Sequence, residues 1–233
     1  MVFGLAENHG DQNQTAESDG IKLQKVNCCK YLGIFIDCNM KWSEHINYIY
    51  NKLIKFVGIF YKLRNKLPIA IQRDIYFAFV YPHLIYGIDL YGNTCPSYLD
   101  KLGKLNNNKL LRTLQGKDRR SPTAELYLTY NTLSLSQLHD LQILLFVHKC
   151  LHHRIALPLL FSKYFSMNNV VHDYKTRQSN LLHLHSTSIQ YGKRCLLNKG
   201  CTLWNNLPNR LQNHMSIHHF KTLLKDICRN VIM

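Results

Sequence analysis

Residues 30–46 read KYLGIFIDCNMKWSEHI, and the chain changes there from a strand-like to a helical pattern. The run 31–36 has the aromatic and β-branched composition of a strand, and Asp37 follows it directly. Glu44 and His45 then lie in the first turn of the helical pattern. These three side chains form either an acid/base or metal site, or part of a joint that only connects two structural parts.

The segment before this stretch is predicted to complete a small β unit. Residues 1–5 are strand-like, and residues 7–20 are polar and contain glycine, which is typical of a loop. Residues 21–26 (IKLQKV) alternate between apolar and polar side chains, as a half-buried strand does. We expect 21–26 to pair with 31–36 as an antiparallel neighbour. A unit of two or three strands is marginal alone, so it should need a partner sheet or helix.

The segment after this stretch is predicted to be one long amphipathic helix. Its apolar side chains recur every four or three residues, which places them on one stripe. The stripe consists of Trp42, Ile46, Ile49, Leu53, Phe56, Phe60 and Leu63. Ser43 is the expected N-cap. Lys52, Lys55, Lys62 and Lys66 share a different face, which is either a phosphate-contact surface or simply a solvated lysine face.

Helices are also predicted over residues 69–90, with a kink at Pro82, and over residues 96–115, 122–130 and 136–153. The aromatic side chains of the first of these are expected in the core, because their surroundings are almost uncharged. In the helix over 96–115, leucines are expected inside and Lys101, Lys104, Lys109 and Arg112 outside.

The remainder of the chain is predicted to be less regular. Residues 116–122 (GKDRRSP) form a basic turn that carries Arg119 and Arg120. Residues 168–213 have weak periodicity and are expected to form loops and short strands, before a last amphipathic helix over 216–229. The fold class is therefore α+β and mostly α, with a small antiparallel β piece at the N-terminus, a helical body and an irregular basic C-terminal region.

Charge is the most informative property of the composition. The chain has 29 Lys and Arg against 14 Asp and Glu, and residues 1–19 hold four of the acids and no Lys or Arg. Residues 20–233 therefore carry a net charge of +19. Such a surplus repels itself unless an anionic partner lies against it. Nucleic acid is the commonest such partner and an anionic membrane is the second.

The cysteines and the apolar runs place the chain inside a cell, without deciding between cytoplasm and nucleus. The eight cysteines are scattered and no secretory leader is recognisable, so we expect free thiols in a reducing compartment. No apolar run reaches the length of about 18 residues that spans a bilayer. We expect no membrane partner, and the sequence does not indicate an oligomeric state.

The sequence predicts no catalytic or metal-binding residues. Nucleotide transfer with two metal ions needs converging carboxylates, and the 14 acids include no adjacent pair. Two weaker metal patterns remain open alternatives. Cys195, Cys201, His214 and His218 nearly have the spacing of a zinc finger, although the first gap is one residue too long. His148 and His152 would share one face of a helix, next to Cys150 and His153.

Several motifs in order resemble one known family. They are KYLGIFID, KWSEHI, YKLRNKLP, YPHLIYGIDLYGNT, HDYKTR, GCTLWNNLPNRLQ and HHFKTLLKD, and together they extend over nearly the whole chain. In this order they resemble the carboxy-terminal part of the reverse transcriptases (RNA-directed DNA polymerases) of non-LTR, LINE-type retrotransposons of the jockey-like kind.

The resemblance implies a division of the chain into three parts. Residues 1–38 would be the remnant of a polymerase palm, 39–165 a helical thumb and connection, and 166–233 a basic C-terminal region. The catalytic aspartates of the family would lie upstream of Met1, so the chain would be a truncated fragment that does not polymerise. No cofactor is then expected here, since Mg²⁺ would belong only to the full-length parent enzyme. Without the rest of the palm, we expect the apolar sides of the first strands to be partly exposed.

The resemblance also implies which residues contact nucleic acid. Lys30, Tyr31, Leu32 and Gly33 would form the hairpin that helps hold the primer end. The helix that begins near Trp42 would be the first thumb helix, packed against an RNA and DNA primer–template duplex independently of sequence. The residues assigned to this contact are Lys30, Tyr31, Leu32, Gly33, Lys52, Lys55, Lys62, Lys66, Arg119, Arg120, Lys175 and Arg177. The alternatives are a helical protein-interaction module without a nucleic-acid role and a zinc-dependent nucleic-acid-binding tail.

Overall fold

The structure is a computed structural model that describes residues 17–18, 21–22, 26–153, 155, 157–161, 163–172, 177–213 and 216–230. The strands are β1 (Glu17–Ser18), β2 (Ile21–Lys22), β3 (Cys28–Tyr31) and β4 (Ile34–Asp37). The first helices are α1 (Ser43–Leu53), α2 (Lys55–Leu63), α3 (Ile69–Phe79), α4 (Tyr81–Ile85), α5 (Ile88–Tyr91) and α6 (Pro96–Lys104). A π-helix, η1 (Leu105–Leu111), continues α6 and leads into α7 (Arg112–Leu114).

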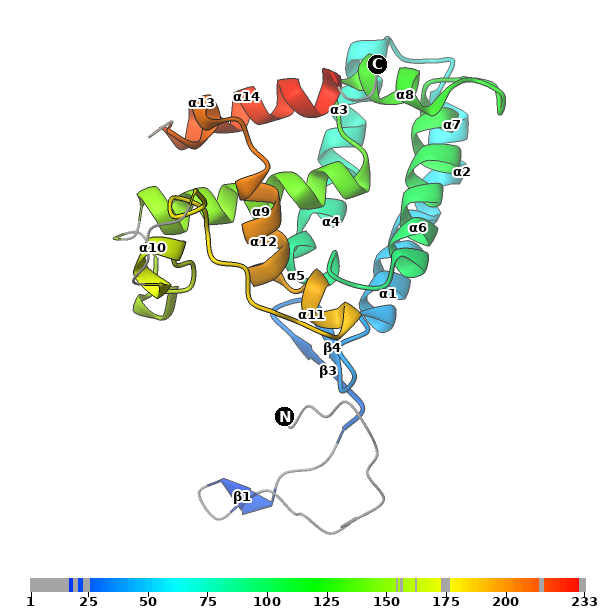
Figure 1. Ribbon diagram of the computed structural model, residues 1–233. Coiled ribbons are helices and arrows are strands. Elements are labelled where there is room, and N and C mark those ends of the chain that lie inside the picture. The colour runs from blue at the N-terminus through cyan, green and yellow to red at the C-terminus, as the bar shows by residue number, and fades with distance from the viewer. Residues whose placement is uncertain are drawn as a thin grey trace.

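The second half of the chain is also helical (Figure 1). It comprises α8 (Thr123–Tyr130), α9 (Leu135–His152), the 3₁₀-helix η3 (Leu159–Phe161), α10 (Asn168–Val171), α11 (Gln190–Arg194), α12 (Leu196–Asn205), α13 (Asn209–Gln212) and α14 (Ile217–Asn230). The predicted class, mostly α with a small antiparallel β piece near the N-terminus, is confirmed.

The strand pairing differs from the prediction. β3 pairs with β4 in an antiparallel hairpin, and β2 pairs with β1 instead of with the YLGIFI run. The reason lies at Leu32 and Gly33, which have φ values of +46° and +83°. Positive φ at both central residues makes a two-residue hairpin turn, so the run that was expected to be one strand is divided between two. Residues 1–5 and 23–25 lie outside the described part of the chain.

The joint between hairpin and helix is built around Asp37. Its Oδ1 accepts a hydrogen bond from the Lys41 amide at 2.8 Å, and its Oδ2 accepts one from the Trp42 amide at 2.6 Å. The N-cap of α1 is Trp42, in a left-handed conformation, so the expectation of Ser43 as the N-cap is wrong. The Asp37 carboxylate therefore fixes the backbone of the N-cap residue Trp42 and of Lys41 before it, and no side chain caps the amides of the first turn of α1.

The long amphipathic helix is confirmed as α1 and α2. Ile54, between them, keeps right-handed helical angles. Most of the stripe is buried, with Phe56 and Leu63 half-buried at its C-terminal end. The break expected at Pro82 falls at Val80, where α3 ends and α4 begins. Two aromatic residues of this region, Phe79 and Tyr86, are 52% and 54% exposed, so the expectation that they lie in the core is wrong.

α9 is the centre of the core. Buried side chains lie all around it, as in a helix that is covered on every side. Its N-terminus carries a capping box, in which Ser134 and Gln137 bond each other's backbone amides. In Figure 1, α9 crosses the middle of the molecule, and α4, α5, α6, α12 and α14 contact it.

The C-terminal region is more regular than predicted. Residues 200–208 were expected to form a loop, but most of them belong to α12 or its end. Cys201 and Trp204 are buried on the side of α12 that packs against α9. The boundary predicted between 165 and 166 stays a prediction, and α12 and α14 pack against α9 across it.

The apolar side chains of the β3–β4 hairpin are partly exposed, as expected, and the burial of residues 21–25 lies outside what the structure describes. Tyr31 and Leu32 at the hairpin tip are 65% and 73% exposed, whereas Ile34 is buried where β4 packs against α1. The hairpin is therefore anchored on the helical body by β4, and its tip is left in solvent.

Candidate nucleic-acid interface

The hairpin tip is held against the helical body by Tyr86. Its hydroxyl donates a hydrogen bond to the carbonyl oxygen of Leu32 at 2.5 Å. A Cβ added at Gly33 would lie 3.6 Å from the Tyr86 ring, so the turn and the ring are in close contact. Lys30, Tyr31, Leu32 and Gly33 do form a hairpin turn, and their part in binding a primer stays a prediction.

Tyr48 of α1 joins the hairpin to the lysine face, by which we mean Lys52, Lys55, Lys62 and Lys66. The ammonium groups of Lys30 and Lys52 each lie 5.5 Å from the centroid of its ring. Such contacts are favourable for a cation above an aromatic face. One ring thus brings together two lysines that the sequence analysis had placed in separate elements.

All four residues of the lysine face are exposed. Lys52, Lys55 and Lys62 lie within α1 and α2, where at 100° and 1.5 Å per residue they fall within about 80° of arc and extend over about 15 Å of helix axis, and Lys66 lies in the turn after α2. The face is not free of acids, because Glu44 is exposed in the first turn of α1. Burial and the nearby Lys52 ammonium lower the pKa of His83, which keeps this α4 side chain neutral beside the face.

The basic turn lies at the far end of α2 from the hairpin. A Cβ added at Gly116 would be 3.9 Å from Oδ1 of Asn65, the residue before Lys66. Arg119 and Arg120 are both exposed in this turn. Figure 1 shows the hairpin at one end of the α1–α2 pair and the 116–121 loop at the other.

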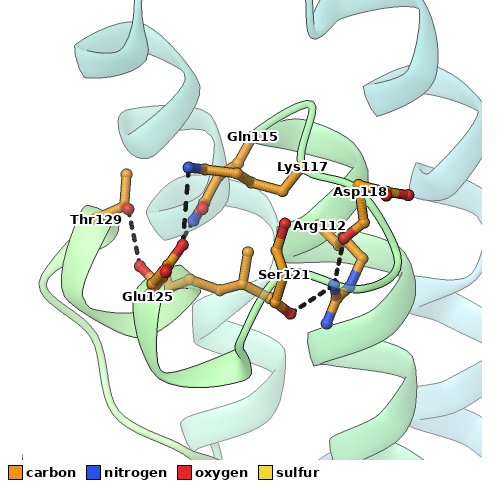
Figure 2. A network of polar contacts seen from close by, with 8 residues as sticks. Arg112, Gln115, Lys117, Asp118, Ser121, Glu125 and Thr129 are labelled. Carbon is orange, nitrogen blue, oxygen red and sulfur yellow. Dashed lines mark hydrogen bonds and ion pairs between the residues drawn. The ribbon is translucent and has the colours of Figure 1, made fainter. Parts of the chain in front are cut away.

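Arg112 holds the basic turn in place, as Figure 2 shows. Its Nη1 donates to the backbone carbonyl oxygens of Asp118 and Ser121, the latter at 2.9 Å. Arg112 is only 6% exposed, so the expectation that it lies outside its helix is wrong. The cause is the loop itself, which folds back over α7 and covers the guanidinium.

Of the two remaining predicted residues, the structure describes only Arg177, which is not part of this surface. Arg177 is exposed. It lies next to α10, since the backbone carbonyl of the following residue, Gln178, accepts a hydrogen bond from the Asn168 side chain. In Figure 1, α10 lies on the opposite side of the molecule from α2. Lys175 lies outside the residues that the structure describes.

The Asp37, Glu44 and His45 junction is a structural joint. Both oxygens of Asp37 accept backbone amides. His45 is 2% exposed, its Nδ1 accepts the Phe35 amide at 3.4 Å, and burial lowers its pKa to about 4. The sequence left an acid/base site open here; Asp37 and His45 are engaged by backbone amides, and Glu44 is exposed.

The zinc patterns are not assembled in the described residues. No group of three or more His, Cys, Asp or Glu that could hold a metal occurs among them, and His214 lies outside them. Burial raises the pKa of the Cys201 thiol to about 11, which disfavours the thiolate that zinc needs. His148 instead stacks on Phe220, with ring centroids 4.4 Å apart.

Sequence reasoning missed Tyr48 and Tyr86 as members of the surface. Tyr48 was four residues before Lys52, and this spacing alone places both on one helix face. Nothing in the sequence near Tyr86 indicates its contact with Leu32, which is 54 positions away.

Curated proteins that are similar to this chain are retrotransposon polymerases. A probable RNA-directed DNA polymerase from transposon X-element of Drosophila melanogaster is 28% identical over 99 residues, which are 41% of this chain. The RNA-directed DNA polymerase from mobile element jockey of the same species is 30% identical over 112 residues, or 45% of this chain. The corresponding Drosophila funebris protein is 30% identical over 101 residues, or 42%.

The resemblance to jockey-like reverse transcriptases is confirmed. The matched stretch spans 11 to 12% of the length of these jockey-like relatives. No family model matches the chain, and no solved structure does. Among the described residues, no helix is both long and apolar enough to cross a bilayer.

Proposed function

We propose that this chain is a non-catalytic nucleic-acid-binding part of a retrotransposon RNA-directed DNA polymerase, and that it holds a primer–template duplex independently of sequence. The observation that carries the proposal is the continuity of the surface. Lys30 on the hairpin and Lys52 on α1 share the ring of Tyr48, and the lysine face continues from there along α2.

The dimensions of the lysine face fit a nucleic-acid strand. The helical part of the face, from Lys52 to Lys62, covers about 15 Å of helix axis, which is equivalent to roughly four phosphate spacings of about 3.4 Å. Lysine contacts to phosphates position a duplex and carry no sequence information. The basic turn would extend the same surface beyond the end of α2, and the net charge of +19 over residues 20–233 supports an anionic partner.

The non-catalytic role is supported by the structural bonds that the Asp37 carboxylate makes in the joint between hairpin and helix. Asp37 is engaged by two backbone amides, and the 14 acids of the sequence include no adjacent pair. We expect no nucleotide incorporation when the chain alone is given a primed template, nucleotides and Mg²⁺. Template-dependent extension of the primer would contradict this part of the proposal.

The binding proposal is tested by charge reversal on the lysine face. The variant Lys52→Glu, Lys55→Glu, Lys62→Glu is compared with Lys149→Glu, Lys193→Glu, Lys221→Glu, which makes the same change of net charge at exposed lysines on α9, α11 and α14. Affinity for an RNA–DNA duplex is measured between 50 and 200 mM salt. Each lost phosphate contact should reduce the salt slope by about one.

We expect the slope of log affinity against log salt concentration to be smaller by about three in the first variant and unchanged in the control. Two duplexes of unrelated sequence should bind the wild type equally. An equal reduction of the salt slope in both variants would show that binding depends on the net charge and not on the position of the lysines, which contradicts a defined interface. Wild-type affinity in the first variant would favour a protein-interaction module without a nucleic-acid role.

A further inference from the structure

A surface pocket of about 360 Å³ lies between η1 and the basic turn. Asn108, Lys109, Arg112 and Arg119 line it, so its wall carries three cations and one amide and no acid. Lys109 and Arg119 are exposed, whereas Arg112 is buried at its base. The volume lies within the range of about 300–1,000 Å³ that is usual for ligand sites.

The π-helix positions two of these side chains. Asn108 and Lys109 belong to η1, and Arg112 follows at the start of α7. Short π-helical segments interrupt α-helices most often at functional sites, because the wider turn changes the direction of the side chains around it. The basic turn then folds back over α7 through the bonds from Arg112 to the carbonyls of Asp118 and Ser121, which brings Arg119 to the pocket.

Arg112 is the feature that points to a ligand. The residue is 6% exposed, and in the part of the chain that the structure describes none of the ion pairs includes its guanidinium. Two backbone carbonyls stabilise one end of the group, but they carry only partial charges. A buried cation without a counterion is costly, and an anion in the pocket that Arg112 lines would remove this cost.

We propose that this pocket binds one phosphate of a nucleic-acid backbone. The inference rests on the proposed function, and it adds a discrete anchoring site to the surface made of the lysine face and the basic turn. Guanidinium groups hold phosphate oxygens with paired hydrogen bonds, and Lys109 adds a point charge. The pocket is at the same end of α2 as Lys66, because Asn65 lies beside Gly116, so a strand that follows the lysine face would reach it.

The test uses the full chain and the variant Lys109→Gln, Arg119→Gln, which removes the two exposed cations and leaves Arg112 in the fold. The control is Lys149→Gln, Lys221→Gln, which removes the same charge from α9 and α14. The first measurement is the salt slope of duplex affinity. The second is the rise in melting temperature with inorganic phosphate at low millimolar concentration and constant ionic strength, which requires no duplex.

We expect the pocket variant to lose a slope of about two and to lose the phosphate-dependent rise in melting temperature, while the control keeps both. A pocket variant that keeps the wild-type slope and the wild-type response to phosphate overturns the inference. If the wild type binds no duplex, and phosphate still stabilises it but not the pocket variant, the interface proposal fails and the anion pocket stands. If duplex binding depends on the lysine face alone, the interface stands and the pocket is rejected.

Discussion

The hydroxyl of Tyr86 donates a hydrogen bond to the backbone carbonyl of Leu32, and this bond connects the end of α4 to the tip of the β3–β4 hairpin. Leu32 and Gly33 both have positive φ, so the tip is a tight turn with a defined direction. The bond sets this direction relative to the helical body. Lys30 shares the Tyr48 ring with Lys52, so the position of the hairpin affects the proposed interface.

Replacing Tyr86 by Phe should weaken nucleic-acid binding and leave the fold intact. The lost bond is exposed, and we expect the free energy of unfolding to fall by at most about 1 kcal/mol. Misplacement of Lys30 should lower duplex affinity by up to about fivefold. Urea unfolding and duplex titration measure the two effects. Tyr61→Phe, at another exposed tyrosine, should change neither, and unaltered duplex affinity in Tyr86→Phe would show that the hairpin takes no part in binding.

Removing the Asp37 carboxylate should destabilise the junction between hairpin and helix. Asp37→Ala leaves two backbone amides at the start of α1 without their acceptor, which should cost about 1–3 kcal/mol in urea unfolding. Asp37→Asn keeps one oxygen acceptor and should cost less. Glu44→Gln, at an exposed side chain, should stay within about 0.5 kcal/mol of the wild type. A neutral Asp37→Ala would contradict the role of Asp37 in fixing the joint before α1.

Two buried histidines should make the fold sensitive to mild acid. Burial lowers the pKa of His45 to about 4. Burial and the Lys199 ammonium, 2.9 Å from Nδ1, lower the pKa of His139 to about 3. In the unfolded chain the pKa of each histidine returns to its ordinary value near 6.5. Between pH 6.5 and the lowered pKa, the unfolded chain therefore binds more protons than the folded chain. Stability is complete above pH 6.5 and falls with pH below it, by at most about 1.4 kcal/mol per pH unit for each histidine.

Urea unfolding at pH 7, 6 and 5 measures this dependence. His139→Gln should reduce the fall in stability between pH 6 and 5, whereas His218→Gln, at an exposed position, should leave it unchanged. A wild type whose stability is constant from pH 7 to 5 would show that neither histidine is buried as the structure has it.

Two glycines should respond to alanine in opposite directions. A Cβ at Gly200 of α12 would lie 3.0 Å from Val147 of α9 and 3.2 Å from the Phe165 ring. Gly200→Ala should therefore destabilise the chain by about 1–3 kcal/mol through overpacking. A Cβ at Gly58 of α2 would meet nothing within 4 Å, and Gly58→Ala should stabilise the chain by about 0.4–1 kcal/mol. Thermal unfolding compares the two variants, and a stabilising Gly200→Ala would contradict the packing of α12 on α9.

The 3.6-residue periodicity of the sequence predicted which side chains share one face of a helix. The stripe from Trp42 to Leu63 and the exposed lysine face both follow from the 3.6-residue repeat, and both are present. The same spacing was available for α12, where Leu197, Cys201 and Trp204 follow each other by four and three residues. Gly200 and the polar Asn198 and Asn205 hid that pattern, and burial against α9 outweighed their low helix propensity.

Contacts between distant segments were beyond the reach of sequence patterns. The division of the YLGIFI run at Leu32 required a non-glycine residue with positive φ, which no local signal indicated. Arg112 seemed to be one more cation on an exposed face, and only the folded loop above it buries its guanidinium. The pocket it lines combines two segments whose juxtaposition depends on that loop.

The packing of α12 and α14 on α9 has a consequence for how such sequences can diverge. The Val147 side chain of α9 fits against α12 only because residue 200 is glycine and has no Cβ. The next residue, His148, stacks on Phe220 of α14. A larger residue at 147 would therefore have to be matched by a shift of α12. Substitutions in α9 and in α12 or α14 should therefore be coupled, and we expect paired substitutions between these helices in related sequences that still fold.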